Sequence, residues 1–158
     1  MKSPFAHLWA LAALLASPVQ AESWAIYKTD THKCSLEYAN SIFTRGEIDA
    51  ENFQRFSGPN KDTYFRVTGL ANEEHLTPRE IRSEYKNSKG KNDLVYERTK
   101  SDFLVLSGFR GEQIFYTRIA VSPNNETICV LHIVYPRTAK RPFDPIVTRM
   151  SRSFTASN

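Results

Sequence analysis

The sequence lacks the motifs that carry most enzyme chemistry. It has no glycine-rich phosphate loop, no His-Glu-x-x-His motif and no calcium-binding loop. The stretch LSGFRG around Ser107 lacks the Gly-x-Ser-x-Gly spacing of a nucleophile elbow, and it follows a strand pattern into a hairpin signal rather than a helix. We therefore interpret this stretch as a hairpin turn, and we expect no catalytic set, no cofactor and no metal.

Long apolar runs are also scarce. The longest, Leu8–Ala16, is too short to span a bilayer; it follows Lys2 and precedes Val19–Ala21, a small-x-small signal peptidase site. We predict that residues 1–21 are a signal peptide cleaved after Ala21, which leaves 22–158 as a single α+β domain. The residue directly after the cut is not a cysteine, so it cannot take a lipid. The mature protein should be periplasmic or secreted, without a transmembrane segment.

Neither charge sign dominates the chain. The full sequence carries a formal net charge of +4, with 21 basic and 17 acidic residues, and only one of these, Lys2, leaves with the signal. A nucleic-acid-binding protein would show a denser basic stripe. We expect no nucleic acid as a partner, and at most a weak attraction to anionic envelope surfaces.

Only two cysteines are present, Cys34 and Cys129. In an oxidising compartment such a pair is most often one disulfide, which we predict here, with a stabilisation of about 4 to 5 kcal/mol for a loop of this length. Two alternatives stay open: two free or intermolecular thiols, or a zinc site that adds His32 and His132. Because alternate residues of a strand face opposite sides, Cys129 and His132 diverge, and one ion would reach both only across a turn or bulge.

Strand patterns dominate the remaining sequence. Runs rich in aromatic and β-branched residues recur about every ten residues between turn signals, which indicates a sheet-based domain. SGPNKD, SGFRGE and SPNNE have the composition of hairpin turns, and the last three strands should form an antiparallel meander. The predicted strands are residues 24–28, 33–38, 52–56, 63–68, 94–97, 103–107, 114–121 and 127–135.

Two helices are predicted from their first residues. Thr77, Pro78 and Glu80 form a capping-box pattern, and NSKGKN (87–92) ends that helix. The second helix should begin with Asp144 as N-cap and Pro145 at its first position. Its apolar face should lie across the sheet as a lid on the core, and it comprises Ile146, Val147, Met150 and Phe154.

Two histidine-containing stretches are the candidates for catalysis. His132 lies on a central or near-central strand, facing Tyr116 or Arg118 across the hairpin, and it is a half-buried histidine that more often fills a polar gap than transfers protons. The Asn72–His75 loop, NEEH, has two carboxylates and a histidine without an assignable partner. We expect a solvated loop.

The most suggestive surface feature is basic. Five cations follow the last strand or lie on the final helix, where they could meet phosphate or carboxylate groups. A solvated face without a ligand is the plainer interpretation. This possible anionic-partner surface comprises Arg137, Lys140, Arg141, Arg149 and Arg152.

Several stretches resemble a family of small exported proteins common in alphaproteobacteria, in which a hairpin precedes a Tyr-Pro strand end and a terminal helix. These are SLEYANSIF, DFLVLSGFRGEQIFYTRIAV, LHIVYP and DPIVTRMSRSF. The sequence also resembles PsbP/Mog1-like proteins. This resemblance implies an α+β fold, an α/β/α sandwich whose antiparallel β-sheet carries flanking helices on both faces. It brings no catalytic set, and because such proteins are mostly accessory or binding proteins, it favours interaction over chemistry.

These observations predict a monomeric, non-enzymatic binding or accessory protein of the bacterial cell envelope. Its expected partner is an envelope protein or an anionic envelope component. The enzymatic alternative is a small periplasmic hydrolase that uses His132 or the Asn72–His75 loop. A purely structural or stress-protective envelope protein is a third possibility.

Overall fold

The computed structural model describes residues 22–88 and 94–158; the predicted signal peptide, 1–21, lies outside the described residues. The larger of its two sheets is antiparallel and has seven strands. Every predicted strand is present, and only the strand ends differ from the prediction by a few residues. In spatial order the strands are β3 (Thr44–Ile48), β4 (Gln54–Ser57), β5 (Tyr64–Ala71), β9 (Thr127–Pro136), β8 (Gln113–Val121), β7 (Phe103–Arg110) and β6 (Leu94–Thr99).

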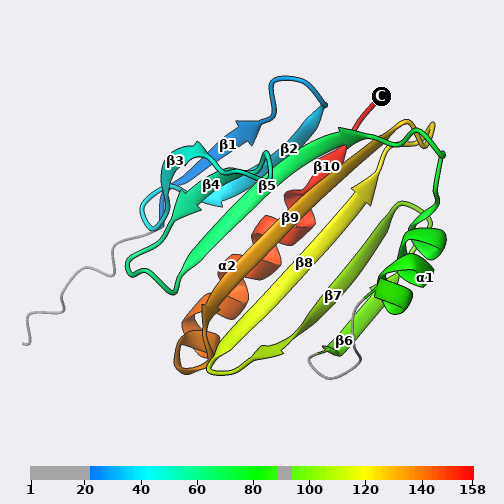
Figure 1. Cartoon of the computed structure of the whole chain (residues 1–158). Coiled ribbons are helices and arrows are strands. Elements are labelled where there is room, and N and C mark those ends of the chain that lie inside the picture. The colour runs from blue at the N-terminus through cyan, green and yellow to red at the C-terminus, as the bar shows by residue number, and fades with distance from the viewer. Residues whose placement is uncertain (1–21, 89–93) are drawn as a thin grey trace, which may run out of the picture.

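A smaller sheet and the second helix cover one face of the seven-stranded sheet (Figure 1). The smaller sheet consists of β1 (Trp24–Lys28), β2 (Cys34–Ala39) and β10 (Thr155–Ala156), and the helix is α2 (Lys140–Ser153). Alternate residues of β9 point into the layer between them, where Leu131 and Ile133 are fully buried with Leu36 and Met150. This is the core face that strand alternation predicts.

The first helix, α1 (Pro78–Ser88), lies over the opposite face, beside β6, β7 and β8 (Figure 1). Its capping box forms as predicted: the Thr77 amide donates to the Glu80 carboxylate at 2.8 Å, and the Glu80 amide donates back to the Thr77 hydroxyl at 3.4 Å. The predicted stop sequence, 87–92, lies largely outside the described residues. With helices on both faces of an antiparallel sheet, the α+β sandwich is confirmed.

The start of the second helix was predicted wrongly. A short 3₁₀ turn, η2 (Arg137–Ala139), leads directly into α2 at Lys140, so Pro145 lies inside the helix and Asp144 does not cap it. The apolar face extends one turn further upstream than predicted, to Phe143, whose ring stacks on Tyr135 at 5.3 Å. Burying this aromatic ring stabilises the additional turn enough to offset the backbone hydrogen bond that proline cannot donate.

Two strands were not predicted, and each lacks a local signal. All five residues of β3 are exposed, and the strand pairs only with β4, so it has no apolar alternation. The other, β10, has two residues and pairs with β2, directly after α2 ends at Ser153. The predicted SGFRGE turn is also shorter than expected, because β7 continues to Arg110 and Ser107 lies within it, donating to the Phe115 carbonyl at 2.8 Å.

Candidate functional site

The two cysteines form a disulfide, as predicted. Cys34 of β2 and Cys129 of β9 are joined with a Cα–Cα distance of 5.7 Å, and both are buried. The bond ties the smaller sheet to a central strand of the larger one. Because both sulfur atoms are used, the alternative zinc site with His32 and His132 does not form, and residues 22–88 and 94–158 contain no cluster of three or more metal-ligand side chains.

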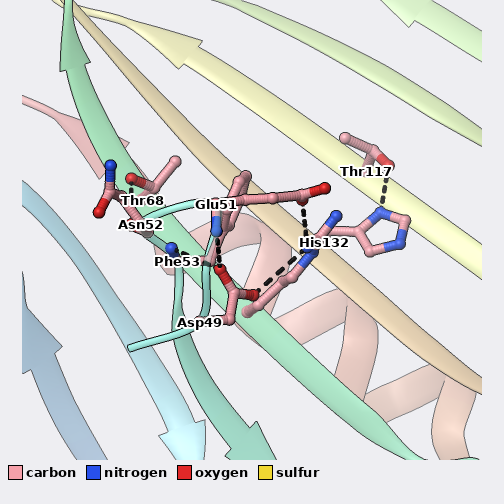
Figure 2. A network of polar contacts seen from close by, with 8 residues as sticks. Asp49, Glu51, Asn52, Phe53, Thr68, Thr117 and His132 are labelled. Atoms are coloured by element: carbon pink, nitrogen blue, oxygen red, sulfur yellow. Dashed lines mark hydrogen bonds and ion pairs between the residues drawn. The ribbon is translucent and has the colours of Figure 1, made fainter. Parts of the chain in front are cut away.

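His132 lies on the sheet face opposite the disulfide. Its cross-strand neighbours are Thr117 on β8 and Arg66 on β5, rather than Tyr116 or Arg118 as predicted, because the register places Tyr116 opposite Ile133 and Arg118 opposite Leu131. The imidazole Nδ1 shares a hydrogen bond of 2.8 Å with the Thr117 hydroxyl (Figure 2). The ring is half-buried and also faces Phe115 at 6.5 Å. An imidazole beside a hydroxyl is one half of a nucleophilic arrangement.

A charged network extends from this histidine along the same sheet face. The Arg66 guanidinium pairs with Glu51 at 2.6 Å and Asp49 at 3.3 Å, and stacks over the Phe53 ring at 4.4 Å. In Figure 2, dashed lines connect the Glu51 and Asp49 carboxylates to the same guanidinium, that of Arg66. Burial acts to raise the pKa of Asp49, but hydrogen bonds from the Phe53 and Glu51 amides, with Arg66, hold it below its ordinary value. The network fixes the β3–β4 turn on β5.

The Asn72–His75 loop is organised by its first residue. Asn72 is buried, and its side chain both donates to the Leu76 carbonyl at 2.9 Å and accepts from the Leu76 amide at 3.0 Å. Glu73, Glu74 and His75 are exposed, as expected for a solvated loop. Asn72 therefore closes the loop before α1, and the structure gives it a structural role.

The five cations predicted to form an anionic-partner surface are all exposed, and we call them the basic face: Arg137, Lys140, Arg141, Arg149 and Arg152. They differ in how they are held. Arg149 pairs with Glu37 at 2.8 Å and lies over the Trp24 ring at 4.1 Å, while Lys140 pairs with Asp144 at 2.6 Å.

The other three cations of the basic face have no carboxylate partner within residues 22–88 and 94–158. Arg137 stacks over the Phe109 ring at 4.0 Å. Among the described residues, Arg141 and Arg152 make no side-chain hydrogen bond or ion pair. These two side chains are the most available to an incoming anion.

Arg152 borders a groove that the sequence did not reveal, at the end of the sheet where β8 meets the segment after α2. The groove has a volume of about 470 Å³. We call it the Arg118–Arg152 groove, after the two cations on its walls. Its polar lining includes Ser101, Asp102, Arg118, Ser122, Arg152 and Thr155, and Phe154 and Ala120 contribute apolar surface.

Arg118 is held in an unusual environment for a cation. Its guanidinium lies over the Phe103 ring, 3.7 Å from the centroid, and its Nε is buried without a hydrogen-bond partner in the described part of the chain. Among the described residues it forms no ion pair, even with Asp102 on the same groove. Burial lowers the pKa of Arg118, and the nearby Tyr116 and Asp102 act against that shift. The side chain is a partly desolvated cation without a counter-ion.

A sequence signal for this groove did exist. Arg118 is two residues from both Tyr116 and Ala120, so strand periodicity places all three on the same, core-facing side of a central strand. A cation on the core-facing side requires an explanation, because charged side chains are rarely buried without a partner. The anionic-partner surface was predicted from the density of cations after the last strand, so it includes Arg152 but not Arg118.

Tyrosines on the same side of the sheet line the layer under α2. The Tyr116 hydroxyl shares a hydrogen bond of 2.6 Å with Ser151, and burial raises its pKa. Burial likewise raises the pKa of Tyr135 to about 12. Both groups therefore stay neutral at physiological pH, which suits packing rather than proton transfer.

No helix within the described residues is long and apolar enough to cross a bilayer.

No protein-family model matches the chain, and no curated protein is significantly similar to it in sequence. Solved structures share its fold. The solution structure of the cyanobacterial PsbP protein, CyanoP, from Synechocystis sp. PCC 6803 matches with a TM-score of 0.59 and 12% identity, over 89% of this chain and 96% of that one. The crystal structure of the Saccharomyces cerevisiae Ran-binding protein Mog1p matches with a TM-score of 0.54 and 8% identity, over 85% and 95%. The chain has a PsbP/Mog1-like fold.

Proposed function

We propose that the protein is an exported, non-enzymatic binding protein of the bacterial cell envelope, which holds an anionic partner against its basic face. The observation that carries this proposal is the division of α2 into two sides. Phe143, Ile146, Val147 and Met150 are buried in the core. The helix leaves four cations and one carboxylate, that of Asp144, on its exposed side. Core packing accounts for the first side and leaves the second unexplained.

The ion pairs on this face do not prevent it from binding. Exposed pairs such as Arg149–Glu37 and Lys140–Asp144 contribute about 0 to 1 kcal/mol each, so a partner's carboxylates can replace them at little cost. Arg141 needs no such exchange. The attraction also acts before contact, because an excess of one sign raises the association rate of an oppositely charged partner.

The fold supports a protein as the partner, and the predicted export suggests that this protein belongs to the envelope. Mog1p, one of the structural neighbours, is a Ran-binding protein, so this fold serves protein binding in that case. Export follows from the predicted signal peptide, and a buried disulfide fits an oxidising compartment. Neither argument requires a catalytic group.

The test is capture from a solubilised envelope fraction at low salt by the purified protein. Arg141→Glu with Arg149→Glu reverses two charges of the basic face outside the Arg118–Arg152 groove. Lys61→Glu with Arg79→Glu is the matched control, because both cations are exposed and lie in the β4–β5 turn and on α1. We expect capture to fall several-fold in the first pair and to persist in the second. Raised salt should weaken the wild type similarly. Equal capture by both pairs would contradict the proposal.

The second candidate is a hydrolase that uses His132, and the Thr117–His132 hydrogen bond is the observation that favours it. A working arrangement needs a third group to orient the base. The neighbour on the other side of His132 is Arg66, a cation already paired with Asp49 and Glu51. Ester or peptide hydrolysis that disappears in both Thr117→Val and His132→Gln would establish this candidate over the first.

A further inference from the structure

The Arg118 guanidinium has an unmet need for a hydrogen-bond acceptor and a counter-charge. Its Nε is buried without a partner, and in native proteins most buried polar groups are paired, so each exception requires an explanation. Its guanidinium carbon lies 3.7 Å from the centroid of the Phe103 ring, so one side of the group contacts an aromatic face. The remaining side of the group borders a groove that also receives Arg152 from the end of α2. Two cations from separate elements therefore converge on one space.

The groove's charge and shape select among anions. Arg118 and Arg152 supply two positive charges and Asp102 one negative charge, which leaves a single positive charge for the ligand to balance. A carboxylate carries one negative charge and is planar, so its two oxygens match the two parallel N–H donors of a guanidinium. A phosphate dianion would carry excess charge beside Asp102. The volume of about 470 Å³ is within the usual range for small-molecule sites and would hold one residue of a peptide.

We propose that the Arg118–Arg152 groove binds a single carboxylate group of the anionic partner. The Arg118 fork donates hydrogen bonds to the carboxylate, Arg152 contributes the second cation from the end of α2, and Ser122 and Thr155 border the remainder of the ligand. This inference rests on the proposed function, and it names the chemical group that the Arg118–Arg152 groove, beside the basic face, recognises. It assigns a binding role to Arg118, which core packing does not explain.

The proposal is tested by titrating the purified protein with N-acetylglycine, which has one carboxylate, with a neutral-capped Gly-Glu-Gly peptide and with inorganic phosphate, using calorimetry at low salt. Arg118→Met keeps the length of the side chain and removes the fork. Arg98→Gln is the control, because Arg98 also lies near the Phe103 ring but does not line the groove. We expect Arg118→Met to weaken carboxylate binding at least about tenfold and Arg98→Gln to change it less than about twofold.

The thermal midpoint separates a binding role from a structural one. If Arg118 awaits a ligand, replacing it with an apolar side chain of similar shape removes an unpaired buried donor, so the midpoint of Arg118→Met should be unchanged or higher. Should that variant fail to fold, Arg152→Gln provides the same test from the exposed wall, with an expected loss of about fivefold. Binding of the free carboxylate alone would identify a small-molecule ligand, and binding of the peptide alone a polypeptide partner.

Three results would overturn the inference: no binding of either carboxylate probe, tighter binding of phosphate than of N-acetylglycine, or unchanged binding in Arg118→Met. Failure here is distinguishable from failure of the proposed function. If envelope capture still depends on Arg141 and Arg149 while Arg118→Met binds the probes like the wild type, the basic face stands and only the groove is excluded.

Discussion

Removing the disulfide should be the most costly single change to this fold that leaves its surface intact. The bond joins residues 95 positions apart and links the two sheets from buried positions. For a loop of this length, constraint of the unfolded chain contributes about 4 to 5 kcal/mol. A domain is stable by about 5 to 15 kcal/mol in total, so the loss is about a quarter of the stability or more. With about 3 to 5 °C per kcal/mol at this size, the midpoint should fall by about 15 °C.

The assay compares the wild type with Cys34→Ala/Cys129→Ala, which leaves no thiol to dimerise. Thermal and urea unfolding should both show the loss, and dithiothreitol should lower the wild-type midpoint towards that of the variant. Gly69 supplies a linked control: an added Cβ would lie 2.6 Å from the Cys34 sulfur and 2.5 Å from the His32 Cβ, so Gly69→Ala should destabilise the wild type more than the sulfur-free variant. A variant midpoint within about 3 °C of the wild type would refute the reasoning.

Three further predictions concern the core, the tyrosines and export. Phe154→Ala removes a ring that is 1% exposed, and urea unfolding should show a loss of roughly 3 to 5 kcal/mol of stability. A loss below about 1 kcal/mol would place the ring outside the core. Because burial raises the Tyr135 pKa to about 12, above about 10 for an unfolded tyrosine, its stabilising contribution is complete below pH 10 and lost as the pH rises towards 12. The phenolate absorbance of the wild type minus that of Tyr135→Phe should therefore rise near pH 12. A rise near pH 10 would contradict the shift. Mass spectrometry of the periplasmic protein should find Glu22 as its first residue, and an intact Met1 would exclude cleavage.

Much of the fold followed from local chemistry in the sequence. The capping box of α1 is set by three neighbouring residues, Thr77, Pro78 and Glu80, and the strand pattern of β9 by two-residue alternation. The disulfide followed from there being only two cysteines. Each of these three features depends on residues close in sequence or on a pairing with a single choice. None of them requires knowledge of the tertiary structure.

The features that were missed depend on long-range packing. The start of α2 depends on Phe143 reaching Tyr135 and Phe43, so proline's preference for a first turn was overridden by tertiary contacts. The smaller sheet closes only when β10 reaches β2, more than a hundred residues away. The Arg118–Arg152 groove joins a strand to the segment after a helix, and no local spacing predicts that meeting.

The central claim is that the outer side of α2 binds a partner, and site-specific photo-crosslinking in living cells tests it most directly. A photoreactive amino acid replaces Arg141 on the basic face or, in a matched strain, Lys61 in the β4–β5 turn, both of which are exposed. On irradiation, position 141 should yield a discrete adduct with an envelope protein that position 61 does not, and added salt should reduce its amount. No adduct from position 141, or the same adduct from both positions, would contradict the account.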